Sequence, residues 1–321
     1  MNRRFGPLVT LCVADAYGAC FEGCDAAVCR ERNDLAGYKT NPHFPKSKSD
    51  KGRYTDDGQL SLGLAEFMLY AGGTDCKGAG ATPAALAWHL VNAYRRDPRS
   101  GYMPGFRKVL ATSADGADFL KRILPHSTKS GGAMRAGLCG LLPTRQDVVD
   151  LAMWQASLTH ATMAGMTSAA AAALMSWHCR NGTAVSDIPH DIAETFPFWG
   201  FDDPWEDDPE GVPNLGVPVV RAALTALQAG GQAAILKACV DMGGDTDTVA
   251  AVAMCAAALH PDVEPDLPDA LFSGLETGPF GLEFLDALDR KLFAKFGLPF
   301  PGDGTVPETP PAGDGIFDLF G

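Results

Sequence analysis

Hydrophobic residues recur three or four positions apart along most of the chain, whereas long alternating patterns are rare. Two segments show this spacing clearly: Leu60, Leu64, Phe67 and Met68 in one, and Val249, Val252, Ala253, Ala256 and Leu259 in the other. A third segment, residues 169–177, is rich in alanine. This spacing places apolar side chains on one face of a helix, and small residues let helices approach closely. The pattern predicts an all-α fold, built as a compact bundle.

Three stretches interrupt the predicted helices. Residues 40–53 form a basic loop, and residues 196–218 combine prolines with an acidic run: Asp202, Asp203, Glu206, Asp207, Asp208 and Glu210. Such a run is typical of a solvated loop; the alternatives are a calcium site or a contact with a basic partner. From Pro299 onward Pro, Gly and Asp dominate. We expect one domain over residues 1–300 and a flexible tail over residues 301–321.

The composition is that of an acidic globular protein. The chain has 321 residues, 26 basic and 39 acidic side chains, and a formal net charge of −13. With 46% hydrophobic and 20% charged residues, a disordered or collagen-like chain is excluded. Nucleic acids and anionic membranes repel an acidic surface, so we expect neither as a partner. The apolar stretches also fall short of the roughly 18 to 20 residues that span a membrane.

The N-terminus and the cysteines bear on the cellular compartment. Basic Arg3 and Arg4 precede an apolar run, as in an export signal, but Asp15 interrupts that run. The nine cysteines are an odd number, and Cys20, Cys24 and Cys29 lack the spacing of a zinc site. We therefore expect reduced thiols in a cytoplasmic protein.

Two acidic motifs open predicted helices. Thr55-Asp56-Asp57-Gly58-Gln59 precedes the first apolar segment, and Gly243-Gly244-Asp245-Thr246-Asp247-Thr248 precedes the second. Helix capping explains one side chain in each, and Asp56 with Gln59 resembles a capping box. Four aspartates and at least two threonines exceed what two caps require.

A metal site accounts for the surplus. Clustered carboxylates raise each other's pKa unless a cation compensates them, and hard oxygen ligands suit Mg²⁺, Mn²⁺ or Ca²⁺. Asp245 and Asp247 lie two residues apart, so Asp247 is placed to bridge two ions. The bare backbone of the adjacent glycines, Gly244 among them, would let a ligand approach. Glu22 follows as a third acidic candidate; its alternative is a surface residue, and Asp15 fits a buried polar tie or a cap.

Five segments in this order resemble the ADP-ribosylglycohydrolase family. They are Asp15-Ala-Tyr-Gly-Ala-Cys-Phe-Glu22, Tyr54-Thr-Asp-Asp-Gly-Gln59, Gly131-Gly-Ala-Met-Arg-Ala136, Leu158-Thr-His160 and Gly243-Gly-Asp-Thr-Asp-Thr-Val-Ala-Ala251. The resemblance runs from about Phe5 to Phe300 and implies a single compact orthogonal multi-helix bundle. It also implies two divalent cations, Mg²⁺ or Mn²⁺, held by Thr55, Asp56, Asp57, Asp245, Asp247 and Thr248.

The same resemblance implies the substrate contacts. Glu22 would lie on a mobile loop that gates the metals and touches the substrate. Ser127, Thr128, Ser130, Gly131 and Gly132 would wrap a diphosphate, His160 would approach the ribose or the phosphates, and Gly101 and Gly105 would lie near the ribose. Other interpretations stay open: His160 as a structural histidine and Gly131-Gly132 as an interhelix turn. Ser130 departs from the asparagine usual in the family, which shortens a hydrogen-bonding arm.

The implied activity is hydrolysis of mono-ADP-ribose from a modified protein side chain, most often arginine, with release of ADP-ribose. Asp57, Asp56 and Glu22 form the candidate catalytic set, in which Asp57 takes a proton from water and either Glu22 or a metal-bound water assists the leaving group. Expected partners are an ADP-ribosylated protein and ADP-ribose, and we expect a monomer. The alternatives are another linkage (serine or O-acetyl-ADP-ribose), a metal-dependent phosphohydrolase, or a non-catalytic relative that binds ADP-ribose.

Overall fold

The computed structural model describes residues 4–43 and 51–301, and over these residues the chain is helical, without a β-strand. This confirms the predicted all-α class. The α-helices are α1 (Pro7–Gly18), α2 (Ala26–Arg32), α3 (Asp56–Tyr70), α4 (Pro83–Arg96), α5 (Pro104–Thr112), α6 (Gly116–Arg122), α7 (Arg145–His160), α8 (Met163–Arg180), α9 (Ile188–Thr195), α10 (Gly216–Leu227), α11 (Gln232–Asp241), α12 (Thr246–Ala257), α13 (Asp269–Ser273) and α14 (Leu282–Phe296). Two short 3₁₀ helices, η1 (Ser130–Gly132) and η2 (Ala136–Leu141), lie between α6 and α7.

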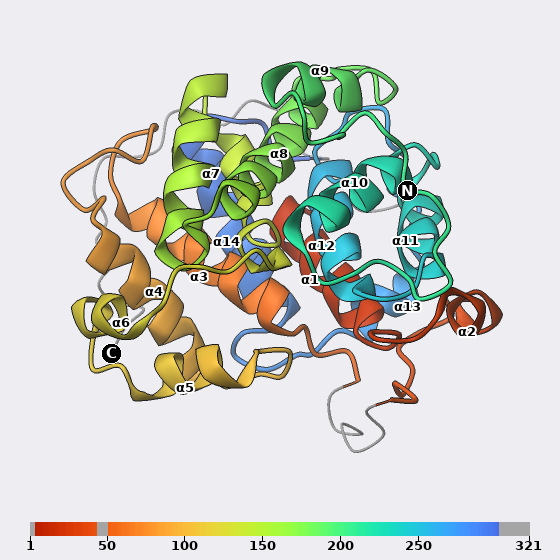
Figure 1. Cartoon of the computed structure of the whole chain (residues 1–321), viewed down its shortest axis with the longest axis horizontal. Coiled ribbons are helices and arrows are strands. Elements are labelled where there is room, and N and C mark those ends of the chain that lie inside the picture. The colour runs from red at the N-terminus through yellow and green to blue at the C-terminus, as the bar shows by residue number, and fades with distance from the viewer. Residues whose placement is uncertain (1–3, 44–50, 302–321) are drawn as a thin grey trace.

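Helices α1 and α12 lie side by side in the middle of the molecule (Figure 1). Every residue of both helices is buried, so neither has a polar face. Gly18 allows their close approach, because a Cβ there would lie 2.5 Å from the Cα of Asp247. The hydroxyl of Thr246 donates a hydrogen bond to the Gly18 carbonyl at 2.9 Å. The end of α1 is therefore fastened to the start of α12.

The predicted segments map closely onto the structure. Residues 60–68 fall inside α3 and residues 169–177 inside α8, while α12 ends at Ala257, two residues before Leu259. The proline-rich stretch is irregular up to Gly216, where α10 begins. Its six acidic residues are all exposed, as the solvated-loop interpretation expects. Residues 44–50 of the basic loop and 302–321 of the predicted tail lie outside the described residues.

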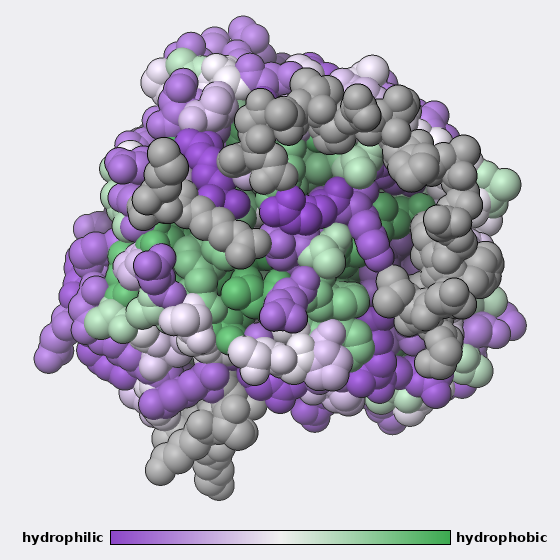
Figure 2. All heavy atoms as spheres, turned by 180° about the vertical axis from the view of Figure 1, so that it is seen from behind, coloured by the Kyte–Doolittle hydropathy of each residue, from purple (hydrophilic) through white to green (hydrophobic). Residues whose placement is uncertain are grey.

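The cysteines, the hydropathy of the helices and the surface are further features of the fold. All nine cysteines are free and buried. No helix among the described residues is long and apolar enough to cross a membrane. On the face opposite to that of Figure 1, hydrophilic residues dominate the rim and hydrophobic residues gather toward the middle (Figure 2).

Candidate active site

Three helix ends bring a group of aspartates together. Asp15 lies near the end of α1, Asp57 in the first turn of α3, and Asp247 in the first turn of α12. One carboxylate oxygen from each lies within 4.8 Å of the others, and all three side chains are buried. The two acidic motifs predicted from the sequence therefore meet in space, together with the end of the first helix.

Asp15 fixes the start of α3 from another helix. Its Oδ2 accepts hydrogen bonds from the backbone N–H groups of Thr55 and Gly58, both at 2.8 Å, and its Oδ1 accepts one from the Thr55 hydroxyl at 2.7 Å. The N-cap Thr55 makes no side-chain cap hydrogen bond. The capping-box interpretation of Asp56 with Gln59 is therefore wrong, because α1 supplies the capping carboxylate. The buried-tie interpretation of Asp15 describes this arrangement.

Asp57 is the member of the cluster with an unused oxygen. Its Oδ1 is buried and has no hydrogen-bond partner among the described residues. Burial raises the pKa of Asp57 well above its usual range, and the neighbouring charges of Asp15, Asp56 and Asp245 raise it further. A buried, unpaired acceptor among like charges is costly unless a cation neutralises it.

The α12 motif is organised by its own hydrogen bonds. Asp247 Oδ1 accepts from the backbone N–H of Thr248 at 2.9 Å, and the Thr248 hydroxyl donates to Asp245 Oδ1 at 3.0 Å. The hydroxyl of Ser130 lies 3.0 Å from Asp245 Oδ2 and 3.0 Å from the side-chain oxygen of Asn214. Burial raises the pKa of Asp247 well above its usual range, and the charges of Glu22 and Asp57 add to it.

Glycines allow close approach at this site. Gly244 has φ +73°, and a Cβ there would lie 2.2 Å from the Val212 carbonyl oxygen, so the chain itself fills the space that the sequence analysis left for a ligand. Gly101 has φ +96° and lies against Asp56, where a Cβ would fall 1.7 Å from Oδ1. Positive φ suits glycine at both positions.

The acidic cluster opens into a cavity that also receives residues from the α6–α7 segment. The predicted site residues that line it are Glu22, Asp56, Asp57, Gly101, Ser127, Ser130, Gly131, His160, Asp245, Asp247 and Thr248. Thr55, Gly105, Thr128, Gly132 and Gly244 are not among the described lining residues. Thr55 instead bonds to Asp15, and the Gly132 carbonyl accepts from the side chain of Gln155 at 2.9 Å.

Glu22 occupies the cavity wall in the turn between α1 and α2. Its carbonyl accepts a hydrogen bond from the Asn41 side chain at 3.0 Å, and the following Gly23 N–H donates to the Gly244 carbonyl at 2.9 Å. Burial raises the pKa of Glu22 to about 7, with contributions from the charges of Asp245 and Asp15. The turn is thus tied to the α12 motif through its backbone, while the half-buried side chain reaches the cavity.

His160 closes another side of the cavity as a neutral ring. Its Nδ1 lies 2.7 Å from the hydroxyl of Thr159, which accepts a hydrogen bond from Arg135 Nη2 at 2.9 Å. Burial and the charge of Arg135 lower the pKa of His160 to about 3. The Arg135 guanidinium is itself buried and also donates to Gln155 and to the Gly131 carbonyl. His160 therefore offers a hydrogen-bonding group without a charge.

The structure adds lining residues that the sequence analysis missed. Asn214 and Lys129 are polar, and an apolar wall comprises Leu60, Met103, Phe106, Ile123, Leu124 and Met134. Lys129 stands between the predicted site residues Thr128 and Ser130, so its position in the sequence could have identified it as a site residue. Asn214 lies in the irregular stretch before α10, where no motif marks it.

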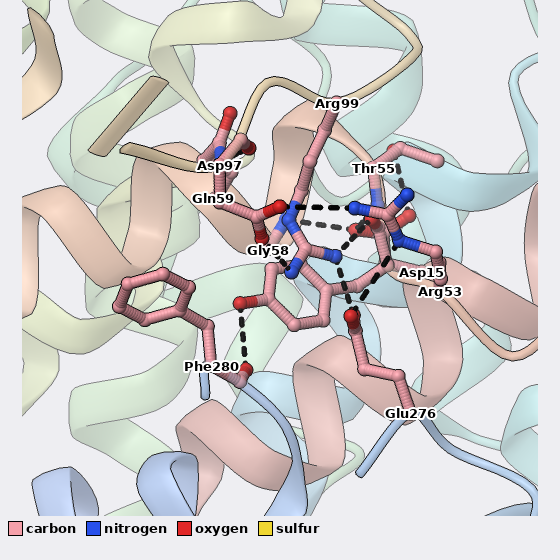
Figure 3. Close-up of polar contacts among 10 residues, drawn as sticks. Asp15, Arg53, Thr55, Gly58, Gln59, Asp97, Arg99, Glu276 and Phe280 are labelled. Carbon is pink, nitrogen blue, oxygen red and sulfur yellow. Dashed lines mark hydrogen bonds and ion pairs between the residues drawn. The ribbon is translucent and has the colours of Figure 1, made fainter. Parts of the chain in front are cut away.

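Behind the cluster, a network around Arg99 holds the loop that carries Gly101 (Figure 3). The Arg99 guanidinium stacks 3.5 Å from the Tyr54 ring centroid, donates to the Tyr54 carbonyl at 2.9 Å, and pairs with Asp97 and Glu276. Gln59 of α3 donates to the Asp97 carbonyl at 2.7 Å and accepts from the Tyr102 hydroxyl at 2.8 Å. The loop and the first turn of α3 are therefore joined on both sides of Gly101.

The residues present fit a hard cation. The donors around the cluster are carboxylate and hydroxyl oxygens, which Mg²⁺, Mn²⁺ and Ca²⁺ prefer. The unpaired Asp57 Oδ1 is an available ligand atom. Asp15 is less available, because three hydrogen bonds already occupy its two oxygens.

Comparison with known proteins shows the family and the fold of the chain. A family model described as ADP-ribosylglycohydrolase matches residues 1–299. The ADP-ribosylhydrolase ARH3 of Bos taurus is 29% identical over 187 residues, which cover 54% of this chain and 48% of that protein. The match thus spans about half of that relative. A solved ADP-ribosylglycohydrolase-related protein complex shares the fold, with a TM-score of 0.67 and 24% identity over 92% of this chain and 98% of that one. The chain belongs to the ADP-ribosylglycohydrolase family.

Proposed function

We propose that this chain is a metal-dependent hydrolase that removes mono-ADP-ribose from modified protein side chains, with arginine as the preferred linkage, and releases free ADP-ribose. The observation that carries the proposal is the buried cluster of Asp15, Asp57 and Asp247, which adjoins a cavity bordered by Glu22. An enzyme that cleaves a glycosidic bond needs an activated water and a proton for the leaving group. The cavity brings carboxyl groups for both tasks.

We assign two divalent cations, Mg²⁺ or Mn²⁺, to the ligands Thr55, Asp56, Asp57, Asp245, Asp247 and Thr248. Their support is the all-oxygen donor set and the orphaned Asp57 Oδ1. When bound, the cations act as Lewis acids that orient the ribose and make water a better nucleophile. Asp15 keeps the Thr55–Asp57 segment in place through its three hydrogen bonds.

The protein groups then divide the proton transfers. Asp57 accepts a proton from the water whose oxygen attacks the ribose C1″. Glu22 delivers a proton to the departing side chain as the C1″ bond to it breaks; its raised pKa favours a carboxyl group that holds a proton for this purpose. Asp56, held against Gly101, orients the reacting groups. The neutral His160 and the backbone of Gly131 contact the ligand without adding charge.

The remaining features of the proposal concern the setting. The substrate is an ADP-ribosylated protein, and nucleic acid is not expected as a partner because the net charge is −13. Nine buried free thiols fit a reducing compartment, so we propose a cytoplasmic location. We also propose that the enzyme is a monomer, formed by the domain over residues 1–300.

The test is release of ADP-ribose from two peptides, one modified on arginine and one on serine. Each is incubated with Mg²⁺, with Mn²⁺ and with chelator, beside Asp247→Ala and the control Asp202→Ala in the exposed acidic loop. We expect metal-dependent release from the arginine peptide, lost in Asp247→Ala and retained in the control. Release from the serine peptide alone would show that the enzyme cleaves the serine linkage and not the proposed arginine linkage. AMP or phosphate as product would indicate a phosphohydrolase, and ADP-ribose binding without turnover a binding protein.

A further inference from the structure

The segment before η1 is held rigidly by its carbonyl groups. Pro125 O accepts from the Ala161 N–H at 2.7 Å, Ser127 O from the Thr162 hydroxyl at 3.0 Å, and Thr128 O from the Gly216 N–H at 3.1 Å. His126 also forms an isolated antiparallel bridge with His160. The α7–α8 junction and the start of α10 therefore fix the backbone that borders the cavity.

The cavity lining shows which side chains of this segment face inward. Ser127 and Lys129, two residues apart, both line the cavity, whereas the intervening Thr128 does not. Lys129 itself is extended, with φ −66° and ψ 171°. The cavity wall thus includes Lys129 and leaves out Thr128, which the resemblance had assigned to the ligand.

The charges around the cavity make this lysine unusual. The acidic residues that line the cavity are Glu22, Asp56, Asp57, Asp245 and Asp247, and the basic residues that line it are Lys129 and Arg135. Arg135 is buried and directs its guanidinium N–H groups to Gln155, Gly131 and Thr159. Lys129 is exposed and forms no ion pair with any residue that the structure describes. Among the lining residues that the structure describes, its ammonium is the side-chain cation without an ion pair or a carbonyl partner.

An ADP-ribose ligand brings two phosphate charges into this acidic surrounding. Ions bound at the aspartate cluster would neutralise carboxylates there, but the diphosphate needs its own positive partner. A charge-assisted hydrogen bond from an ammonium group supplies both the charge and a donor. We propose that Lys129, presented by the fixed 125–130 segment beside Ser127, recognises the diphosphate of ADP-ribose and so sets specificity for phosphorylated ligands; this rests on the proposed function.

The test measures binding of ADP-ribose, AMP and adenosine by calorimetry, with Lys129→Met and Lys129→Arg beside the wild type. Lys291→Met on α14 is the matched control, an exposed lysine on a helix outside the cavity wall. We expect Lys129→Met to bind ADP-ribose about tenfold more weakly, AMP less affected, and adenosine unchanged. Lys129→Arg and the control should stay close to the wild type. In turnover assays the loss should raise KM and leave kcat nearly unchanged.

The two proposals fail in different ways. Equal affinity of Lys129→Met and wild type for ADP-ribose would overturn the role of Lys129, as would an equal loss for adenosine, which carries no phosphate. If the wild type binds ADP-ribose but releases none from modified peptides, the hydrolase proposal falls, while binding still decides the role of Lys129. If the wild type binds none of the three ligands, both proposals are wrong. Thermal unfolding of each variant confirms that comparisons involve folded protein.

Discussion

At the scale of single residues, one glycine shows how tightly the acidic cluster is packed. Gly101 lies between Arg99 and Tyr102, both of which are anchored to the segment around Tyr54 and Gln59. Its φ of +96° and its contact with Asp56 leave no space for a side chain. The backbone at Gly101 thus helps to fix the direction of the Asp56 carboxylate.

We predict that Gly101→Ala lowers kcat at least tenfold and destabilises the protein by about 1 to 2 kcal/mol, the usual cost of a non-glycine residue at positive φ. The added methyl group must displace Asp56, so activity should fall more than stability does. Steady-state kinetics and urea unfolding measure the two effects. Gly278→Ala is the control, because a Cβ there meets nothing within 4 Å. Full activity in Gly101→Ala would show that the position of Asp56 is not critical.

Residues in compact motifs could be predicted from the sequence, and residues recruited by the fold could not. Asp57 and Asp247 stand in motifs whose carboxylates exceed the needs of capping, and the structure places them together. The role of Asp15 depends on the contact between α1 and α3, which no local pattern encodes. Asn214 reaches Ser130 from 84 positions along the chain. Lys129 was passed over although it stands between two predicted residues, because only the structure shows which side chains of this segment reach the cavity.

At the scale of helices, buried carboxylates from neighbouring elements cap helix starts. Asp15 does so for α3, and Asp289 of α14 does so for α1, accepting from the N–H groups of Leu8 and Val9, both at 3.0 Å. A Cβ on Gly6 would lie 2.4 Å from the Asp289 carboxyl group. Burial raises the pKa of Asp289 to about 7, although these two N–H groups lower it. The start of the central helix therefore depends on a titratable group.

This raised pKa predicts a pH dependence of stability. Between the unfolded pKa near 3.8 and about 7, folded Asp289 keeps a proton that the unfolded chain has lost, so the free energy of unfolding falls as pH rises. Asparagine at position 289 cannot ionise, so the free energy of unfolding of Asp289→Asn does not fall with pH for this reason. We expect its destabilisation relative to wild type to be smaller at pH 8 than at pH 5, measured by urea unfolding.

The matched control is Asp118→Asn on α6, where the pKa of the partly exposed aspartate is lowered from its usual value, chiefly by Arg122. Folded and unfolded Asp118 are both ionised from pH 5 to pH 8, so its substitution should cost the same at both. A destabilisation by Asp289→Asn that stays constant between the two pH values would contradict the raised pKa.

Helices were predictable where apolar residues recur three or four positions apart, even though α3 and α12 are buried almost throughout. Segments 60–68 and 249–259 carry apolar spacing, and α3 and α12 cover them almost to the residue. The central helix α1 is also buried on every side, but its sequence shows an apolar run rather than a periodic stripe. Its resemblance to an export signal has the same cause.

At the scale of the molecule, the site concentrates negative charge in a protein whose net charge is already −13. The helix ends that build it belong to α1, α3 and α12, which form the middle of the bundle (Figure 1). The carboxylates therefore oppose the folding of the elements that carry them unless a cation is bound. The carboxylates that the proposed reaction needs therefore lower the stability of the metal-free protein.

We predict that Mg²⁺ or Mn²⁺ raises the melting temperature of the wild type by several degrees and that chelator reverses the effect, since a ligand at 100 times its Kd stabilises the folded state by about 2.7 kcal/mol. The order of the melting temperatures of Asp57→Asn and the wild type should differ between the metal-free and the metal-bound protein. Without metal it should melt above the wild type, because one buried like charge is gone and the unpaired Oδ1 no longer belongs to a carboxylate. With metal it should melt below the wild type, because a ligand charge is missing.

Differential scanning calorimetry of both proteins, with saturating metal and with chelator, measures this crossing. Asp202→Asn, at an exposed position of the acidic loop, should shift neither value. A crossing would mean that the cluster is built to be completed by a cation, since hydrogen bonding alone gives Asp57 no reason to destabilise the metal-free protein. If Asp57→Asn instead melts lower under both conditions, the carboxylate is a structural group that the fold needs, and the ligand assignment of Asp57 is wrong.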